Sequence, residues 1–165
     1  RQMCIRDRQY EDYIGTYTAT VDDYDEGPTS QSVTITPKVR GESYTLKSIG
    51  GFNFTLLYDK ASGKLILDSQ SISPVSSSSY YFACAAGVEG YAHTELSLPS
   101  RLRSGLVNVT ANTNPFTFYF ADKASQENTL LIIWAYSSDE YSTSGLMGYW
   151  SWYNSILMEK ENEGN

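Results

Sequence analysis

The feature that most constrains the fold is a repeated two-residue alternation. Short segments in which Tyr, Thr, Val, Leu or Phe alternate with polar residues recur from Tyr13 to Lys160. Gly, Ser, Asn and Asp separate these segments, and no stretch keeps the spacing of an amphipathic helix. The pattern predicts an all-β fold, namely a single antiparallel meander barrel of about eight to ten strands.

Individual segments follow this pattern with different clarity. The first expected strand, Tyr13–Asp22, places its aromatic and aliphatic residues on one face and its threonines on the other. The clearest hairpin joins Phe54–Asp59 to Lys64–Gln70. A last strand is expected over Ser155–Lys160, whereas residues 87–115 show no firm period, and the sequence predicts no strand order there.

Charge and hydropathy narrow the classes of partner. The 165 residues carry a formal net charge of −7. A nucleic-acid-binding surface usually needs a basic stripe, and docking on anionic lipid also needs positive charge. The longest continuous apolar run, Leu130–Tyr136, is far shorter than the ~20 residues of a transmembrane helix. We therefore expect no nucleic-acid partner and no transmembrane segment in this chain.

The two ends differ from the patterned region. Residues 1–8 are basic and unpatterned, and they resemble the translated adapter read-through found at the ends of metagenomic gene fragments. We expect a non-native leader over residues 1–8, a β-barrel domain over residues 9–160 and a frayed tail over residues 161–165. The residues before Cys4 are not the small apolar ones of a lipobox, so an export signal or lipid anchor is expected only upstream.

Three short motifs carry a family resemblance. Tyr13–Tyr17 opens the first strand, Tyr58–Gln70 reads as strand, turn and strand, and Gly148–Trp150 precedes the last strand. Together they resemble the lipocalin-like β-barrel domains of bacterial cell-envelope lipoproteins. Gly15-Thr16-Tyr17 is similar to the Gly-x-Trp opening of lipocalins, with Tyr in place of Trp. The resemblance implies a meander barrel, export to the periplasm or cell surface, a lipid anchor supplied by a missing N-terminus, and no enzyme activity.

An aromatic cluster near the C-terminal end is the candidate ligand-binding site. It comprises Tyr149, Trp150, Trp152 and Tyr153. Trp150 and Trp152 are expected to point to the same side of an extended chain. Flat aromatic rings on one side can stack on sugar faces or line an apolar opening. The alternative is that one or both tryptophans close the end of the barrel core.

Other groups give weaker indications of chemistry. The acidic segment Asp22–Gly27 offers carboxylates of the kind that Ca²⁺ prefers, but it lacks the EF-hand spacing and is better interpreted as a solvated turn. His93 is the only histidine, and no Gly-x-Ser-x-Gly motif surrounds a serine. Asp139 and Glu140 lie near the aromatic cluster but are adjacent, so on a strand they would face opposite ways. We expect no catalytic residues, no metal and no cofactor.

The sequence therefore favours a non-catalytic, exported β-barrel module that binds a glycan or a small apolar ligand. The alternative is a structural or protein-interaction domain, a filled barrel that docks with an envelope protein partner. A hydrolase remains a third hypothesis, and it requires His93 or a pair of carboxylates in an open cleft.

Overall fold

The computed structural model describes residues 9–61, 63–67, 70–87, 105–109, 117–122, 130–141 and 143–161. Two short 3₁₀ turns, η2 (Tyr10–Tyr13) and η3 (Thr143–Gly145), accompany the strands. The strands are β1 (Gly15–Asp23), β2 (Gly27–Val39), β3 (Ser43–Ile49), β4 (Phe52–Asp59), β5 (Lys64–Leu67), β6 (Gln70–Pro74), β7 (Tyr81–Gly87), β8 (Gly105–Val109), β9 (Thr117–Asp122), β10 (Leu130–Tyr136) and β11 (Leu146–Lys160). The chain is all-β, as the alternation predicts.

The strands form a closed antiparallel barrel. Strands β1 to β5 pair in sequence, the order continues through β8, β9 and β11, and β11 pairs with β1. This ring has eight strands, which confirms the prediction of a single antiparallel barrel. Closure leaves these eight strands without a free edge along the ring, so their backbone groups find partners within the sheet.

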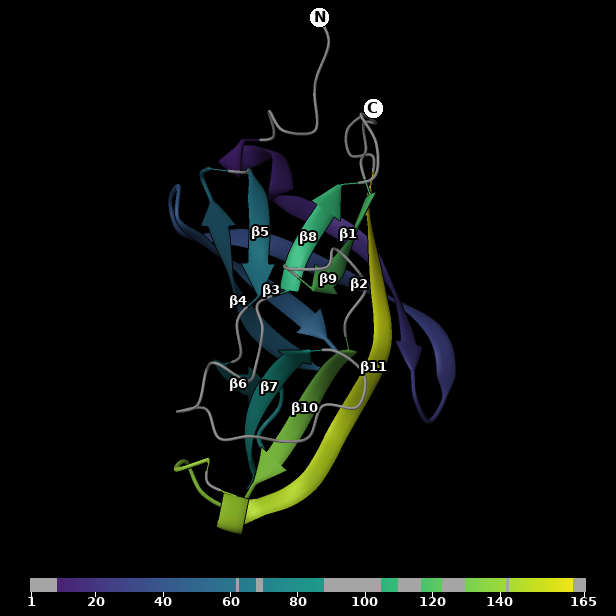
Figure 1. The fold of residues 1–165 in the computed structure, drawn as a ribbon, viewed down its shortest axis with the longest axis vertical. Coiled ribbons are helices and arrows are strands. Elements are labelled where there is room, and N and C mark those ends of the chain that lie inside the picture. Colours follow the sequence, from purple (N-terminus) through teal and green to yellow (C-terminus); the bar gives the residue numbers. More distant parts are fainter. Residues whose placement is uncertain are drawn as a thin grey trace, which may run out of the picture.

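One part of the wall departs from simple meander order, because it is built in two tiers (Figure 1). Strand β4 pairs with β5 toward its end and with β6 at its start. Strand β11 likewise pairs with β9 at residues 157–159 and with β10 at residues 146–153. The hairpin of β8 and β9 therefore completes one tier, and β6, β7 and β10 complete the other.

The side-chain amide of Gln70 joins the two tiers at β4. Strands β5 and β6 follow each other in the chain, but their registers against β4 differ. At this break Gln70 accepts a hydrogen bond from the Thr55 backbone N–H at 2.8 Å and donates one to the Thr55 carbonyl at 2.9 Å. The side chain thus satisfies both backbone groups of Thr55, which buried strands require.

The alternation predicted for the first two strands is confirmed in the core. On β1 the fully buried residues are Tyr17, Ala19 and Val21, and on β2 they are Val33 and Ile35. The intervening threonines and serines are more exposed. The barrel interior is filled by these side chains together with those of β3 and β4, as expected for a barrel of this strand number.

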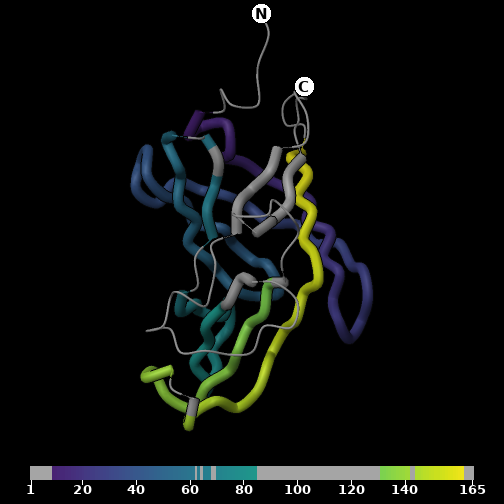
Figure 2. Tube along the Cα trace, in the orientation of Figure 1, coloured from purple at the N-terminus to yellow at the C-terminus, as the bar shows by residue number. Residues whose placement is uncertain are grey.

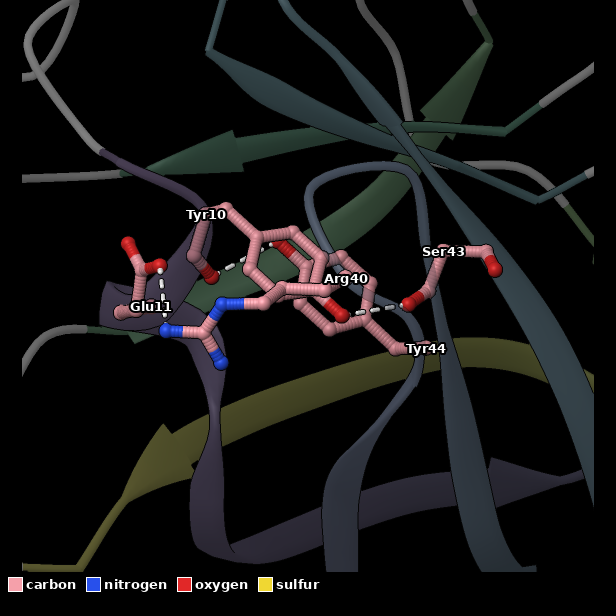
Figure 3. A network of polar contacts seen from close by, with 5 residues as sticks. All are labelled: Tyr10, Glu11, Arg40, Ser43 and Tyr44. Atoms are coloured by element: carbon pink, nitrogen blue, oxygen red, sulfur yellow. Dashed lines mark hydrogen bonds and ion pairs between the residues drawn. The ribbon is translucent and has the colours of Figure 1, made fainter.

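A tyrosine network closes one end of the barrel (Figure 3). The ring of Tyr10, in η2, stacks on Tyr44 with centroids 4.4 Å apart. The Tyr10 hydroxyl donates to the Ser43 carbonyl at 2.6 Å, and the Tyr44 hydroxyl donates to the Tyr10 carbonyl at 2.9 Å. Outside the stack, Arg40 lies 3.7 Å from Glu11 as an exposed ion pair. The reciprocal hydrogen bonds fix η2 across the barrel mouth.

The turn between β3 and β4 lies at the opposite end and folds against β2, β11 and the residue that follows β6. The Gly50 backbone N–H donates to the Gln31 side chain at 2.8 Å, and the Val75 N–H donates to the Gly51 carbonyl at 2.7 Å. Gly50 has a φ of +63°, and a Cβ added there would collide with the hydroxyl of Tyr153. The position therefore needs glycine for both its backbone angle and its close approach to β11.

Replacing Tyr44 with Phe tests the tyrosine network. Tyr44→Phe leaves the buried Tyr10 carbonyl without this donor, so we expect a loss of about 1–2 kcal/mol in the free energy of unfolding, measured by urea denaturation. Tyr24→Phe is the control, because the Tyr24 side chain is 63% exposed. Equal stability of the two variants would contradict the role given to the network.

Replacing Gly50 with Ala tests the close approach of the turn. Gly50→Ala is expected to lower the free energy of unfolding by about 2 kcal/mol or more, because strain at positive φ adds to overpacking. Removing the Tyr153 hydroxyl in Gly50→Ala/Tyr153→Phe should restore part of that loss, as thermal melting would show. A double variant no more stable than Gly50→Ala would exclude the clash as a cause.

Candidate functional site

All four residues of the aromatic cluster lie on one strand. The sequence predicts a last strand that begins at Ser155, but β11 begins at Leu146 and includes Tyr149, Trp150, Trp152 and Tyr153. The predicted boundary is therefore wrong. The strand was hidden because its register against β10 shifts twice, and each shift breaks the two-residue period that marks a strand in sequence.

A β-bulge separates the two tryptophans. Ile133 of β10 lies opposite Ser151, and the next residue, Trp134, lies opposite Tyr149. Trp150 is thus the extra residue of the bulge. Because a bulge redirects the side chains around it, Trp150 and Trp152 contact different neighbours, and the expectation that they share one side is wrong.

Trp150 borders a hollow at the end of the barrel that holds the β3–β4 turn. Its ring lies 5.3 Å from the buried Phe82 in an edge-to-face contact and 6.1 Å from Tyr80. The side chain remains 53% exposed. The hollow has a volume of about 260 Å³ and is open to solvent. Its lining consists of Trp150, Phe52, Phe82, Pro74, the Gly50-Gly51 turn and the serines Ser76, Ser77 and Ser78.

We call this feature the Trp150 hollow. Its apolar floor is Phe52 against Phe82, whose ring centroids are 4.8 Å apart. Its polar side is the serine-rich connection between β6 and β7. Sequence reasoning found Trp150 but not the other walls, because they come from segments far apart in the chain.

Trp152 of β11 belongs to a second aromatic group, which packs against the β1–β2 turn. Its ring centroid lies 5.5 Å from that of Tyr24 and 5.5 Å from that of Tyr149. The Tyr149 hydroxyl donates to the carboxylate of Asp25 at 3.1 Å and 3.2 Å. That hydrogen bond, reinforced by burial and by the negative charge of Asp25, raises the pKa of Tyr149. These contacts hold the β1–β2 turn against β11.

Tyr153, the fourth predicted site residue, lies in the core. It is 4% exposed, and its hydroxyl packs against Gly50. Burial raises the pKa of Tyr153, and a hydrogen bond with Ser151 offsets part of that rise. Tyr153 therefore supports the β3–β4 turn that forms one wall of the Trp150 hollow, and is not itself exposed to a ligand.

In the acidic turn, the carboxylate of Asp23 binds backbone N–H groups of the same turn. One carboxylate oxygen of Asp23 accepts hydrogen bonds from the backbone N–H groups of Asp25 at 2.8 Å and Glu26 at 3.1 Å. Over the described ranges, no three His, Cys, Asp or Glu side chains gather as a metal site requires. Asp139 and Glu140 are exposed in the β10–β11 connection.

Cys84 and His93 are two further residues considered in the sequence analysis. Cys84 is 1% exposed and belongs to the hydrophobic core, as its apolar neighbours indicate. His93 lies outside the described residues, as do Cys4 and residues 162–165. The hydrolase hypothesis that depends on His93 therefore has no described geometry to support it.

The sequence matches a known protein family. Residues 6–134 match the DUF4987 family, a domain of unknown function, and this range is more than half of the chain. The chain belongs to the DUF4987 family. The matched range ends within β10, so β11, which closes the barrel and carries Trp150, lies beyond it. No curated protein and no solved structure matches the chain.

Among the residues that the structure describes, no helix has the length and apolar character needed to cross a bilayer.

Ionisation of the buried tyrosines gives the barrel a predictable pH dependence. Burial raises the pKa of Tyr44 and, more weakly, those of Tyr10, Tyr58 and Tyr153. An acid whose pKa is higher folded than unfolded stabilises the fold below its unfolded pKa and loses that contribution as pH rises above it. We expect the urea midpoint to fall above about pH 10, and less steeply in Tyr44→Phe. A midpoint that stays constant into this range would contradict the burial of these hydroxyls.

Proposed function

We propose that this chain is a non-catalytic, exported binding module that holds a glycan in the Trp150 hollow. The observation that carries the proposal is the mixed lining of that hollow, which combines a half-exposed tryptophan with three serines. Export to the periplasm or cell surface, with lipid anchoring upstream, rests on the resemblance to lipocalin-like envelope barrels. The closed antiparallel barrel supports that part only at the level of the fold.

The aromatic wall supplies what a sugar ring needs. The apolar face of a pyranose packs on a flat aromatic ring, and Trp150 offers such a ring with 53% of its surface exposed. The edge-to-face contact with Phe82 holds the indole in place. A ring that is already fixed loses little conformational entropy when a ligand stacks on it.

The polar wall favours a glycan over a small apolar ligand. The hydroxyls of Ser76 and Ser77 can donate and accept hydrogen bonds, as the hydroxyls of a sugar require. The Ser78 hydroxyl accepts a hydrogen bond from the Tyr80 backbone N–H at 3.1 Å and keeps its own O–H as a donor. An apolar ligand is usually enclosed in a pocket of about 300–1,000 Å³ that removes most of its surface from water. A hollow of about 260 Å³ that stays open to solvent accommodates one sugar unit of a longer chain better than an enclosed lipophile.

Substitution of the two tryptophans tests the site. We expect Trp150→Ala to weaken glycan binding about tenfold or more, because it removes the stacking surface from the centre of the contact. Trp152→Ala is the matched control on the same strand, since Trp152 packs on Tyr24 and Tyr149 instead. Binding is measured by thermal shift and calorimetry on a glycan panel that includes lipophilic compounds.

Two results would contradict the assignment. If Trp150→Ala bound a glycan as tightly as the unchanged chain, the hollow would not be the site. If only lipophilic compounds raised the melting temperature, the ligand class would be wrong.

The second candidate function is a structural or protein-interaction domain in the cell envelope. The dense interior favours it, since Tyr13, Tyr17, Tyr44 and Phe54 are all at most 2% exposed and pack in the hydrophobic core. A glycan and lipophile screen without any shift would support this alternative, and capture of an envelope partner would then be the next step.

A further inference from the structure

A second hollow lies on the outer wall of the barrel, on the strands β2, β3, β4 and β6. It has a volume of about 280 Å³, and its polar lining includes Lys38, Thr45, Asn53, Thr55, Gln70 and Ser71. On β4 the residues Asn53 and Thr55 alternate with the buried Phe52, Phe54 and Leu56, so they face outward. We call this feature the outer groove.

The outer groove and the Trp150 hollow lie on opposite faces of one strand pair, at neighbouring positions. Phe52 of β4 pairs with Pro74 of β6, and both residues line the Trp150 hollow. The next pair along the same two strands, Asn53 with Ser73, lines the outer groove. The two hollows are thus one residue apart on a shared strand pair, one on its inner face and one on its outer face. A ligand chain that leaves the Trp150 hollow would have to pass over the rim of the barrel to reach the outer groove.

The outer face around the groove carries positive charge in an acidic protein. The chain has a formal net charge of −7, yet the outward positions here include Lys38 on β2 and Lys47 on β3. Apart from Lys38, the described residues that line the groove carry no charge. They are Thr45, Asn53, Phe54, Thr55, Gln70, Ser71, Ile72 and Ser73. The outward carboxylate of β4, Asp59, lies beyond this lining. Because no carboxylate stands among these lining residues, the groove favours an anionic group over a neutral one.

The Lys38 ammonium is oriented toward the groove. It donates a hydrogen bond to the Thr55 hydroxyl at 2.8 Å. An ammonium group has three N–H donors, so this contact places the group while leaving capacity for a carboxylate. Thr55 lies three residues from Phe52, which is about 10 Å along an extended strand. That separation suits sugar units of one oligosaccharide that are not adjacent but lie further along the same chain.

We propose that the glycan is a linear chain bearing uronic-acid carboxylates. One sugar stacks on Trp150, and a carboxylate further along the chain meets Lys38 in the outer groove. This inference rests on the proposed function, because the outer groove is reached from the Trp150 hollow. It adds a charge requirement that glycan binding at Trp150 alone does not include.

Matched probes isolate the charge. Short oligogalacturonate, oligoglucuronate and oligomannuronate are each compared with their fully methyl-esterified forms, which keep the sugar chain and lose the negative charge. We expect at least one acid form to bind more tightly than its ester, with the difference shrinking as salt concentration rises. Calorimetry on the full chain measures both affinities.

The variant Lys38→Met makes the corresponding change in the protein, because it removes the positive charge and keeps most of the apolar part of the side chain. We expect it to weaken binding of the acid form by about three- to fivefold, within the range of an exposed ion pair, and to leave binding of the ester unchanged. Lys60→Met is the control, since Lys60 is an exposed lysine in the turn between β4 and β5. Unchanged melting temperatures verify that both variants fold.

The outcomes separate this inference from the proposed function. If neutral glycans and esters bind as tightly as the acids and depend on Trp150, the charge requirement is wrong and the proposed function stands. If Lys38→Met and Lys60→Met weaken the acid form equally, the outer groove is not the carboxylate site. If none of the acidic chains binds at all, the inference is overturned.

Discussion

The structure depends on the double pairing of β11. One edge of this strand pairs with β1 over residues 153–160, which closes the barrel, and the other edge pairs with β10 and then with β9. Each tier of the wall therefore needs β11 for its last hydrogen-bonded neighbour. The bulge at Trp150 lies in the part of β11 that pairs with β10, before the residues that pair with β1. It turns Trp150 out of the regular alternation and toward the hollow.

The two ends of the barrel are covered by different structures. At one end, η2 and the stacked tyrosines bury their rings and satisfy their hydroxyls with backbone carbonyls. At the other end, the β3–β4 turn folds over and is fixed by Gln31 and Tyr153, which leaves an open hollow beside it. Figure 2 shows how β11 runs along one side of the molecule, from the β10–β11 connection to the C-terminal end. One end is thus closed by packed aromatic rings, and the other keeps an open hollow beside the turn.

Sequence alone predicts the parts of this fold that rest on local periodicity. The buried face of β1 and the inward Val33 and Ile35 follow from simple alternation, and so does the barrel class. The start of β11 could not be predicted, because bulges interrupt its period. The two-tiered wall could not be predicted from the sequence either, because it depends on which strands pair with each half of β4 and of β11. The candidate site shows the same division: the tryptophan is visible in the sequence, but its partners Gly50, Phe82 and Ser77 converge only through topology.

The central claim is that a glycan lies against Trp150, and fluorine NMR of the chain labelled with 5-fluorotryptophan tests it directly. The chain has three tryptophans, and their resonances are assigned with Trp→Phe variants. During titration with a glycan that raises the melting temperature, the account predicts that the Trp150 resonance shifts while those of Trp134 and Trp152 stay close to their free positions. A bound glycan that leaves the Trp150 resonance unmoved, or that shifts Trp152 instead, would contradict the account.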